Sequence, residues 1–129
     1  MREKDFQTRF NSWLTNRFIG SGAFELKLTH EKSLPFSAVQ EHQIHALNMA
    51  KYKSLVYKIS DSGIGTKPFD CFKLEGVPAY VVVMYYKRGQ KDFYMIDIDA
   101  FMTEMNISER KSLTPERAGR IGKLYTLGE

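Results

Sequence analysis

The sequence has little cysteine and no long apolar run. Its single cysteine, Cys71, excludes an internal disulfide and any zinc site built from cysteines. No apolar run approaches the roughly 20 residues that a membrane-spanning helix requires. The N-terminal residues, Met1 to Phe6, are mostly charged, and no apolar segment follows them, so no signal peptide is expected. These features predict a cytoplasmic protein without a membrane anchor.

Length and composition indicate one ordinary domain that spans residues 1–129. The chain has 129 residues, of which 43% are hydrophobic and 26% charged, a balance typical of globular proteins. Nine Phe, seven Tyr and one Trp supply a large aromatic core. The net charge of +4 suits a partner that carries phosphates, because Lys and Arg displace the counterions of nucleic acids. A slightly basic surface that serves only solubility explains the same excess.

The first half of the chain predicts a helix, a strand and a second helix. Residues 3–18 place apolar side chains at helical spacing on one face. Residues 23–29 alternate strictly, as a half-buried strand does, with Phe24 on one side and Glu25 and Lys27 on the other. A second helix is expected from about Ser37 to Tyr52, with Ser37 as N-cap and Gln40 completing a capping box.

The second half predicts several strands and two further helices. Strands are expected over 54–59, 69–74, 79–86 and 92–98, with a turn-rich loop over 60–68 and a hairpin loop over 87–91. The run 79–86 is continuously apolar, which indicates a strand buried on both faces. Helices are expected over 98–105 and from Thr114, the N-cap, with Pro115 at the first helical position. This order predicts an α/β fold with a mixed central sheet flanked by helices.

Glu25 and Lys27 are the first candidates for a functional site. They lie two residues apart on a strand, so both side chains leave the same face. A carboxylate can bind Mg²⁺, which prefers one or two carboxylates together with water and phosphate. A neighbouring ammonium can orient the attacking water or neutralise charge that develops on the phosphate. The competing interpretation is a solvated surface ion pair, which is common and weak.

A metal site needs a second acid, and Asp70 is the candidate for it. Asp70 follows Pro68 and Phe69 where the turn-rich loop leads into an apolar stretch. An Asx turn after proline is the structural alternative for Asp70, and Asp61 is a weaker candidate with a stronger turn pattern. Gln40 and Gln43 lie near the start of the second helix, and Gln43 is preferred as a residue that supports the site.

Two further groups of residues allow a functional and a structural interpretation. His42 and His45 share one helical face, but the sequence offers no third metal ligand at a suitable spacing. Lysines alternate with tyrosines in the middle third of the chain, from Lys51 to Lys73. Such a mixture suits a nucleic-acid groove, and it also suits an ordinary solvated surface with snorkelling lysines.

These segments together resemble the Holliday-junction resolvase branch of the PD-(D/E)XK nucleases. The resemblance covers residues from about 3 to 102 and is carried by the segments 24–29, 34–37, 42–47, 79–86 and 93–98. In that branch a strand with Glu-x-Lys leads to a helix with a Gln, and a late strand pair follows. The resemblance implies a restriction-endonuclease-like fold, hydrolysis of DNA, including branched DNA, and a homodimer. It also implies Mg²⁺ as cofactor, with Mn²⁺ able to substitute, and a small phage or bacterial protein in the cytoplasm.

The sequence departs from this family at one position. The family carries a metal-binding Asp on the strand before Glu-x-Lys, whereas no acid lies between Phe6 and Phe24. Either Asp70 replaces it from a later strand, which we favour, or the site is degenerate and only binds. The resemblance also suggests that an acid of the first helix, Glu3, completes the metal site.

The sequence therefore leads to one expected function and two alternatives. We expect a metal-dependent DNA endonuclease in which Glu25, Asp70 and Glu3 hold the metal and Lys27 and Gln43 assist. The first alternative is a catalytically degenerate module on the same fold that binds nucleic acid or protein. The second is a structural or accessory protein that has no role with nucleic acid. If the Asp70 carboxylate lies far beyond the reach of a metal shared with Glu25, the nuclease interpretation loses its main support.

Overall fold

The structure, a computed structural model, describes residues 1–60 and 67–128. The described residues form a mixed α/β fold with four α-helices and one short 3-10 helix. In chain order the elements are α1 (Glu3–Arg17), β1 (Ala23–Thr29), β2 (Leu34–Pro35), η1 (Phe36–Ala38), α2 (Glu41–Tyr52), β3 (Ser54–Lys58), β4 (Cys71–Glu75), β5 (Ala79–Tyr85), β6 (Asp92–Asp97), α3 (Ile98–Ile107), β7 (Ser112–Leu113), α4 (Pro115–Ile121) and β8 (Lys123–Thr126). No helix in this part of the chain is long and apolar enough to cross a membrane.

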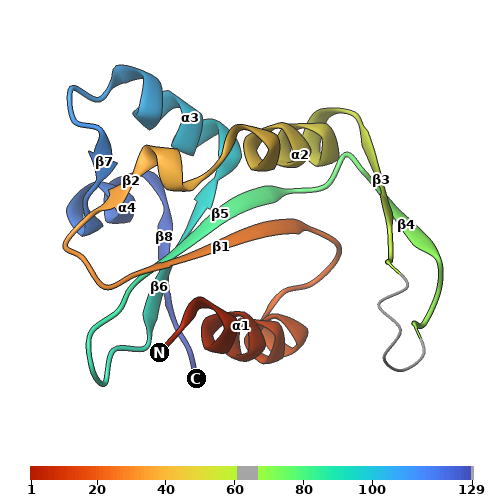
Figure 1. Cartoon of the computed structure of the whole chain (residues 1–129), viewed down its shortest axis with the longest axis horizontal. Helices are drawn as coiled ribbons and strands as arrows, with labels where there is room; N and C mark the ends of the chain where they lie inside the picture. Colours follow the sequence, from red (N-terminus) through yellow and green to blue (C-terminus); the bar gives the residue numbers. More distant parts are fainter. Residues whose placement is uncertain (61–66, 129) are drawn as a thin grey trace.

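The central sheet has four strands in the order β1-β5-β6-β8. Strand β1 runs parallel to β5, whereas β5–β6 and β6–β8 are antiparallel, so the sheet is mixed as expected. Helix α1 covers one face, and α2, α3 and α4 cover the other (Figure 1). Strand β5 lies between both layers and is almost wholly buried, which confirms the prediction for residues 79–86.

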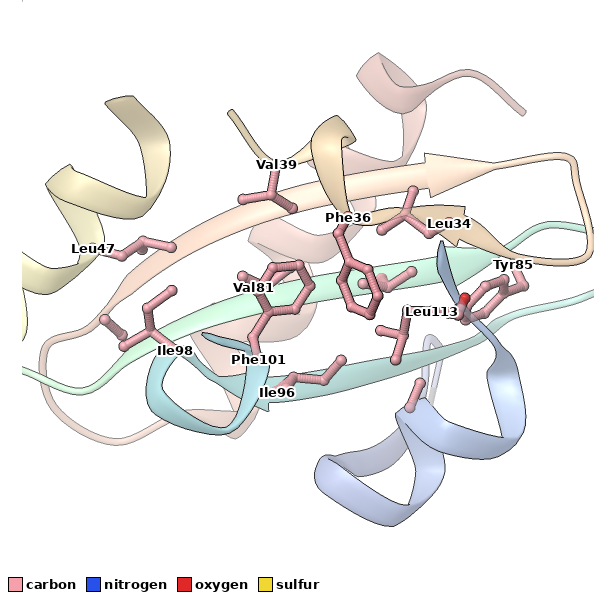
Figure 2. Close-up of a cluster of buried hydrophobic side chains, with 13 residues drawn as sticks. Leu34, Phe36, Val39, Leu47, Val81, Tyr85, Ile96, Ile98, Phe101 and Leu113 are labelled. Atoms are coloured by element: carbon pink, nitrogen blue, oxygen red, sulfur yellow. Dashed lines mark hydrogen bonds between the residues drawn. The ribbon is translucent and has the colours of Figure 1, made fainter. Parts of the chain in front are cut away.

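Two apolar clusters hold the helices on the sheet, one on each face. On the α1 face, Phe6, Phe10 and Trp13 of the helix pack on Phe93 and Val82 of the sheet. On the opposite face the cluster joins the sheet to α2, α3 and α4 through Leu34, Phe36, Val39, Leu47, Val81, Ile96, Phe101, Leu113 and, on α4, Ala118 (Figure 2). Alternate side chains of each strand therefore enter different clusters, because successive side chains point to opposite faces of the sheet.

The second helix begins later than its sequence predicts. Gln40 is the N-cap instead of Ser37, and Oε1 of Gln43 accepts a hydrogen bond from the Gln40 backbone N–H over 2.9 Å. Residues 36–38 form the 3-10 helix instead. The reason is tertiary: Phe36 and Val39 are 5% and 3% exposed, and burying both keeps this segment out of the helix. The prediction that Ser37 opens the helix is therefore wrong.

Strands β3 and β4 form a separate two-stranded hairpin that projects beyond the central sheet (Figure 1). Its ladder pairs Leu55 with Leu74 and Tyr57 with Phe72. Tyr57 is 60% exposed and Phe72 38%, so the outer part of the hairpin has no core of its own. A two-stranded hairpin gains little stability by itself. Contacts of β3 and β4 with α2 therefore mainly determine the position of the hairpin.

Gly122, at the end of α4, gives a first test of this packing. A Cβ built there would lie 2.6 Å from Cγ1 of Ile96 and 2.8 Å from the carbonyl oxygen of Met95. We expect Gly122→Ala to lower the free energy of unfolding by about 1–3 kcal/mol, because the sheet must move. The matched control is Gly119→Ala, where the nearest atom, on Tyr94, is 3.5 Å away. Urea unfolding of both variants checks this, and equal effects would contradict it.

Candidate functional site

Glu25 and Lys27 lie on the side of the sheet that faces α2. Strand β1 is an edge strand, and its register places Glu25 opposite Val81 and Lys27 opposite Val83. Val81 and Val83 belong to the core beneath α2, so the two charged side chains leave on that same face. This confirms the alternation that the sequence predicts for residues 23–29.

The pair is not freely solvated. Nζ of Lys27 lies 3.6 Å from Oε2 of Glu25, and the side chains are only 14% and 26% exposed. Burial raises the pKa of Glu25, while the Lys27 ammonium acts to lower it. Partial removal of the carboxylate from water is the larger effect. A cation bound at this carboxylate would therefore relieve a cost that Lys27 relieves only in part.

Glu3 reaches the same strand from the N-terminus of α1. Its Oε2 accepts a hydrogen bond from the backbone N–H of Leu28 over 3.2 Å, at the open edge of β1. Its negative charge contributes to the raised pKa of Glu25, so the two carboxylates lie within electrostatic range of each other. The first helix thus supplies a second acid at the edge of β1, although Glu3 does not line the pocket at Glu25. One or two carboxylates, completed by water and phosphate, are the protein ligands that Mg²⁺ prefers.

Helix α2 and the hairpin complete a pocket beside Glu25, which we call the α2 pocket. It has a volume of about 330 Å³ and is lined by Ala23, Phe24, Glu25, His42, Gln43, Ala46, Leu47, Leu55 and Tyr57. His42 acts to lower the pKa of Glu25, which places a third polar group at this carboxylate. Oε1 of Gln43 is occupied by the N-cap of α2, an interaction that fixes this side chain. The sequence-based choice of Gln43 over Gln40 agrees with this lining.

The structure does not bring Asp70 to Glu25. Asp70 precedes β4, and its backbone carbonyl accepts a hydrogen bond from Ile59 over 2.8 Å. Its side chain is 86% exposed and pairs with Lys67 over 3.1 Å. It neither lines the α2 pocket nor contributes to the pKa shift of Glu25. Asp61, the weaker candidate, lies outside the described residues.

The β3–β4 ladder ends at the pair Lys58–Cys71, and one further step of its alternation would place Asp70 on the face of two residues of the α2 pocket. Cross-strand partners point to the same side, and Asp70 lies opposite Ile59. Ile59 alternates with Tyr57 and Leu55, the two hairpin residues that line the pocket. Within residues 1–60 and 67–128, no three His, Cys, Asp or Glu side chains are grouped closely enough to hold a metal. The acids gathered at β1 are thus Glu25 and Glu3.

The sequence singles out Glu25, Lys27 and Gln43, but it misses two neighbours of the pocket. The sequence suggests His42 only as a metal-binding partner of His45. His42 lines the pocket, whereas His45 does not. Tyr57 has no signal in the sequence that would link it to Glu25, because the contact depends on how the hairpin meets α2. The comparisons with known proteins add no relative: no protein-family model and no curated protein matches this chain.

Proposed function

We propose that this chain is a metal-dependent DNA endonuclease with a restriction-endonuclease-like fold, resembling the PD-(D/E)XK nucleases. The observation that supports this most is the half-buried Glu25–Lys27 pair, with Glu3 of α1 as a second carboxylate that accepts the backbone N–H of Leu28 on the same strand. A fully solvated pair, the competing interpretation, would leave both side chains largely exposed. Helix α2 instead covers Glu25 and lines the pocket beside it with His42 and Gln43.

Each residue has a definite role in this proposal. Glu25 and Glu3 would hold a Mg²⁺ or Mn²⁺ ion through carboxylate oxygens. Such an ion would supply an activated water and stabilise negative charge on the phosphate. Lys27 places its ammonium beside the same phosphate and neutralises charge that develops during hydrolysis. His42 and Gln43 offer further hydrogen bonds to the phosphate or to the attacking water.

Asp70 is the proposed third acid, and its role is separable by experiment. By the alternation of the β3–β4 ladder, its face of the hairpin would also carry Tyr57 and Leu55, which line the α2 pocket. DNA laid across this face would lie between the hairpin and Glu25. Asp70→Asn is therefore expected to reduce cleavage without changing metal affinity at Glu25. If Asp70→Asn lowers both equally, Asp70 is itself a metal ligand.

The decisive test is cleavage of plasmid, linear duplex and four-way-junction DNA with Mg²⁺ or Mn²⁺. Glu25→Gln and Lys27→Ala are each expected to reduce the rate at least about 100-fold, the size typical of losing one group that stabilises charge. His45→Ala is the matched control, because His45 is exposed on α2 and outside the pocket. Cleavage that survives EDTA, or that continues at full rate in both variants, contradicts the proposal.

Metal binding gives a readout independent of cleavage. We expect Mn²⁺ to raise the unfolding midpoint of the wild-type chain, because a ligand that binds only the folded state stabilises it. The same addition should have little effect on Glu25→Gln. The junction and duplex substrates distinguish a resolvase-like preference from general DNA cleavage. Light scattering with and without junction DNA tests the proposed homodimer.

A degenerate binding module is the second candidate function. It is favoured by the exposed position of Asp70 and its ion pair with Lys67, away from Glu25. In that case the wild-type chain binds DNA in EDTA, and it cleaves none of the three substrates with either metal.

A further inference from the structure

A second polar surface lies along α1, on the opposite face of the sheet from the α2 pocket (Figure 1). A hollow of about 620 Å³ runs between α1, Lys91 and the C-terminal Leu127–Gly128 segment. A second hollow, of about 340 Å³, adjoins it and shares Thr8, Arg9 and Lys91. We call the two hollows together the α1 groove.

Three cations line this groove without carboxylate partners. Arg9 and Arg17 lie on α1, and Lys91 follows the turn between β5 and β6; all three are exposed. None of them forms an ion pair with a carboxylate in the described part of the chain, where Arg2, Lys27, Lys51, Lys67, Lys73, Arg117 and Arg120 do. Like charges gathered in one concave surface attract an anion.

Among the described residues that line the groove, the one acid, Asp5, does not neutralise these cations. Asp5 lines the second hollow, but its Oδ2 accepts a hydrogen bond from the Arg2 backbone N–H over 2.9 Å. The same oxygen lies 3.5 Å from Nε of Arg2, so Asp5 is already paired. The positive charge of Arg9, Arg17 and Lys91 therefore remains available to a ligand.

The spacing of the cations fits an extended phosphate backbone better than a single phosphate. Arg9 and Arg17 are eight residues apart on one helix, so their backbones are separated by about 12 Å along its axis. Phosphates of one DNA strand recur about every 3.4 Å along the duplex axis. Ser12 and Asn16, between the two arginines, add polar groups along the same path.

The floor of the groove argues against a membrane as the partner. Of the apolar side chains there, Trp13 and Leu127 are 9% and 5% exposed, and Met1 and Tyr86 are partly buried against the same core. A peripheral membrane surface needs exposed apolar side chains that can enter the lipid. Buried side chains cannot do so, whereas phosphate binding needs only the cations at the rim.

We propose that the α1 groove binds the DNA backbone as a contact separate from the α2 pocket. It extends the proposed function to the path of the substrate, but its test needs neither metal nor cleavage. The contacts are to phosphates, so binding here is independent of base sequence.

The test is fluorescence anisotropy with single-stranded and duplex DNA in EDTA over a range of NaCl concentrations. The variant Arg9→Ala/Arg17→Ala/Lys91→Ala should weaken binding at least about tenfold at low salt. The slope of log K against log salt should become shallower by about two to three, near 0.9 for each lost phosphate contact. The control, Arg110→Ala/Lys111→Ala/Arg120→Ala, removes the same charge from exposed positions around α4. It should change the slope far less.

Each outcome decides the inference. Equal losses in both triple variants, or no loss in the α1 variant, overturn it. If the α1 variant loses binding to phosphatidylserine vesicles but keeps DNA binding, the partner is a membrane and the inference is wrong. Rescue by Arg9→Lys/Arg17→Lys, in place of alanine, supports a role of charge. Loss of DNA binding in the α1 variant of a chain that cleaves no DNA would sustain this inference while refuting the nuclease.

Discussion

Phe93→Ala is expected to lower the free energy of unfolding by about 3–5 kcal/mol, the usual cost of removing a large buried aromatic ring. Phe93 is fully buried on β6. Its ring centroid lies 4.9 Å from that of Trp13 and 5.6 Å from that of Phe10, both edge to face. It also stacks on Tyr125 at 5.8 Å, so one ring joins α1, β6 and β8. Collapse around the hole would have to displace all three elements.

Urea unfolding, followed by tryptophan fluorescence, measures this loss directly, because Trp13 contacts the ring. Natural domains are stable by only about 5–15 kcal/mol, so the variant loses a large part of the total. Phe93→Leu should lose less, because it leaves a smaller cavity. Phe69→Ala is the matched control, since Phe69 is 53% exposed. A loss below about 1 kcal/mol in Phe93→Ala would show that this cluster is not the main core of the α1 face.

We expect Arg117→Ala to cause the second large loss of stability, because it leaves the Glu104 carboxylate without its partner. Glu104 of α3 is 5% exposed. Arg117 of α4 donates two hydrogen bonds to it, from Nε over 2.9 Å and from Nη2 over 2.7 Å. Without Arg117, the Glu104 carboxylate is desolvated and unpaired, which costs about 2–3 kcal/mol. Replacing both by apolar groups, as in Glu104→Leu/Arg117→Met, should cost less than the single change.

The pH dependence of stability distinguishes this cause from simple loss of packing. In the wild type, the Arg117 hydrogen bonds hold the pKa of Glu104 below its ordinary 4.5. The pair therefore stabilises the fold above that value, and its contribution disappears as the pH falls through the lowered pKa. In Arg117→Ala, burial alone acts on Glu104 and raises its pKa, so the deficit should shrink as the pH falls toward 5. Arg120→Ala, which breaks the exposed pair with Glu116, should show neither effect. A deficit that is constant with pH would contradict this explanation.

Local patterns in the sequence predict most of the fold. The alternation of residues 23–29 predicts β1 and the face that carries its polar side chains. Thr114 is the N-cap of α4, as expected, and its hydroxyl oxygen accepts a hydrogen bond from the backbone N–H of Arg117 over 3.2 Å. The strands β2 and β7 are only two residues long, too short to show any period. Strand β8 exists because it pairs with β6, and no local signal in residues 123–126 indicates that partner.

The site is predictable only where its residues share one element. Glu25 and Lys27 face the same way because strand geometry requires it, whatever surrounds them. Glu3 joins them because α1 crosses the edge of β1, which depends on packing across the sheet. The position of Asp70 relative to Glu25 depends on the hairpin, and the β3–β4 ladder does not fix the angle between the hairpin and the central sheet. The α1 groove combines Arg9 and Arg17, visible along one helix, with Lys91, which only the folded chain brings to them.

The parallel pairing of β1 with β5 also bears on the order of folding. The antiparallel β5–β6 hairpin needs only the short turn over residues 86–91 to close, whereas β1 must wait until residues 30–78 are looped back. Closing a long loop lowers the entropy of the chain before stabilising contacts form, so non-local strand pairs form slowly. We therefore expect β1 to join an existing hairpin late, as an edge strand. Glu25, Lys27 and the backbone N–H of Leu28, which donates to Glu3, would then be assembled in that late step.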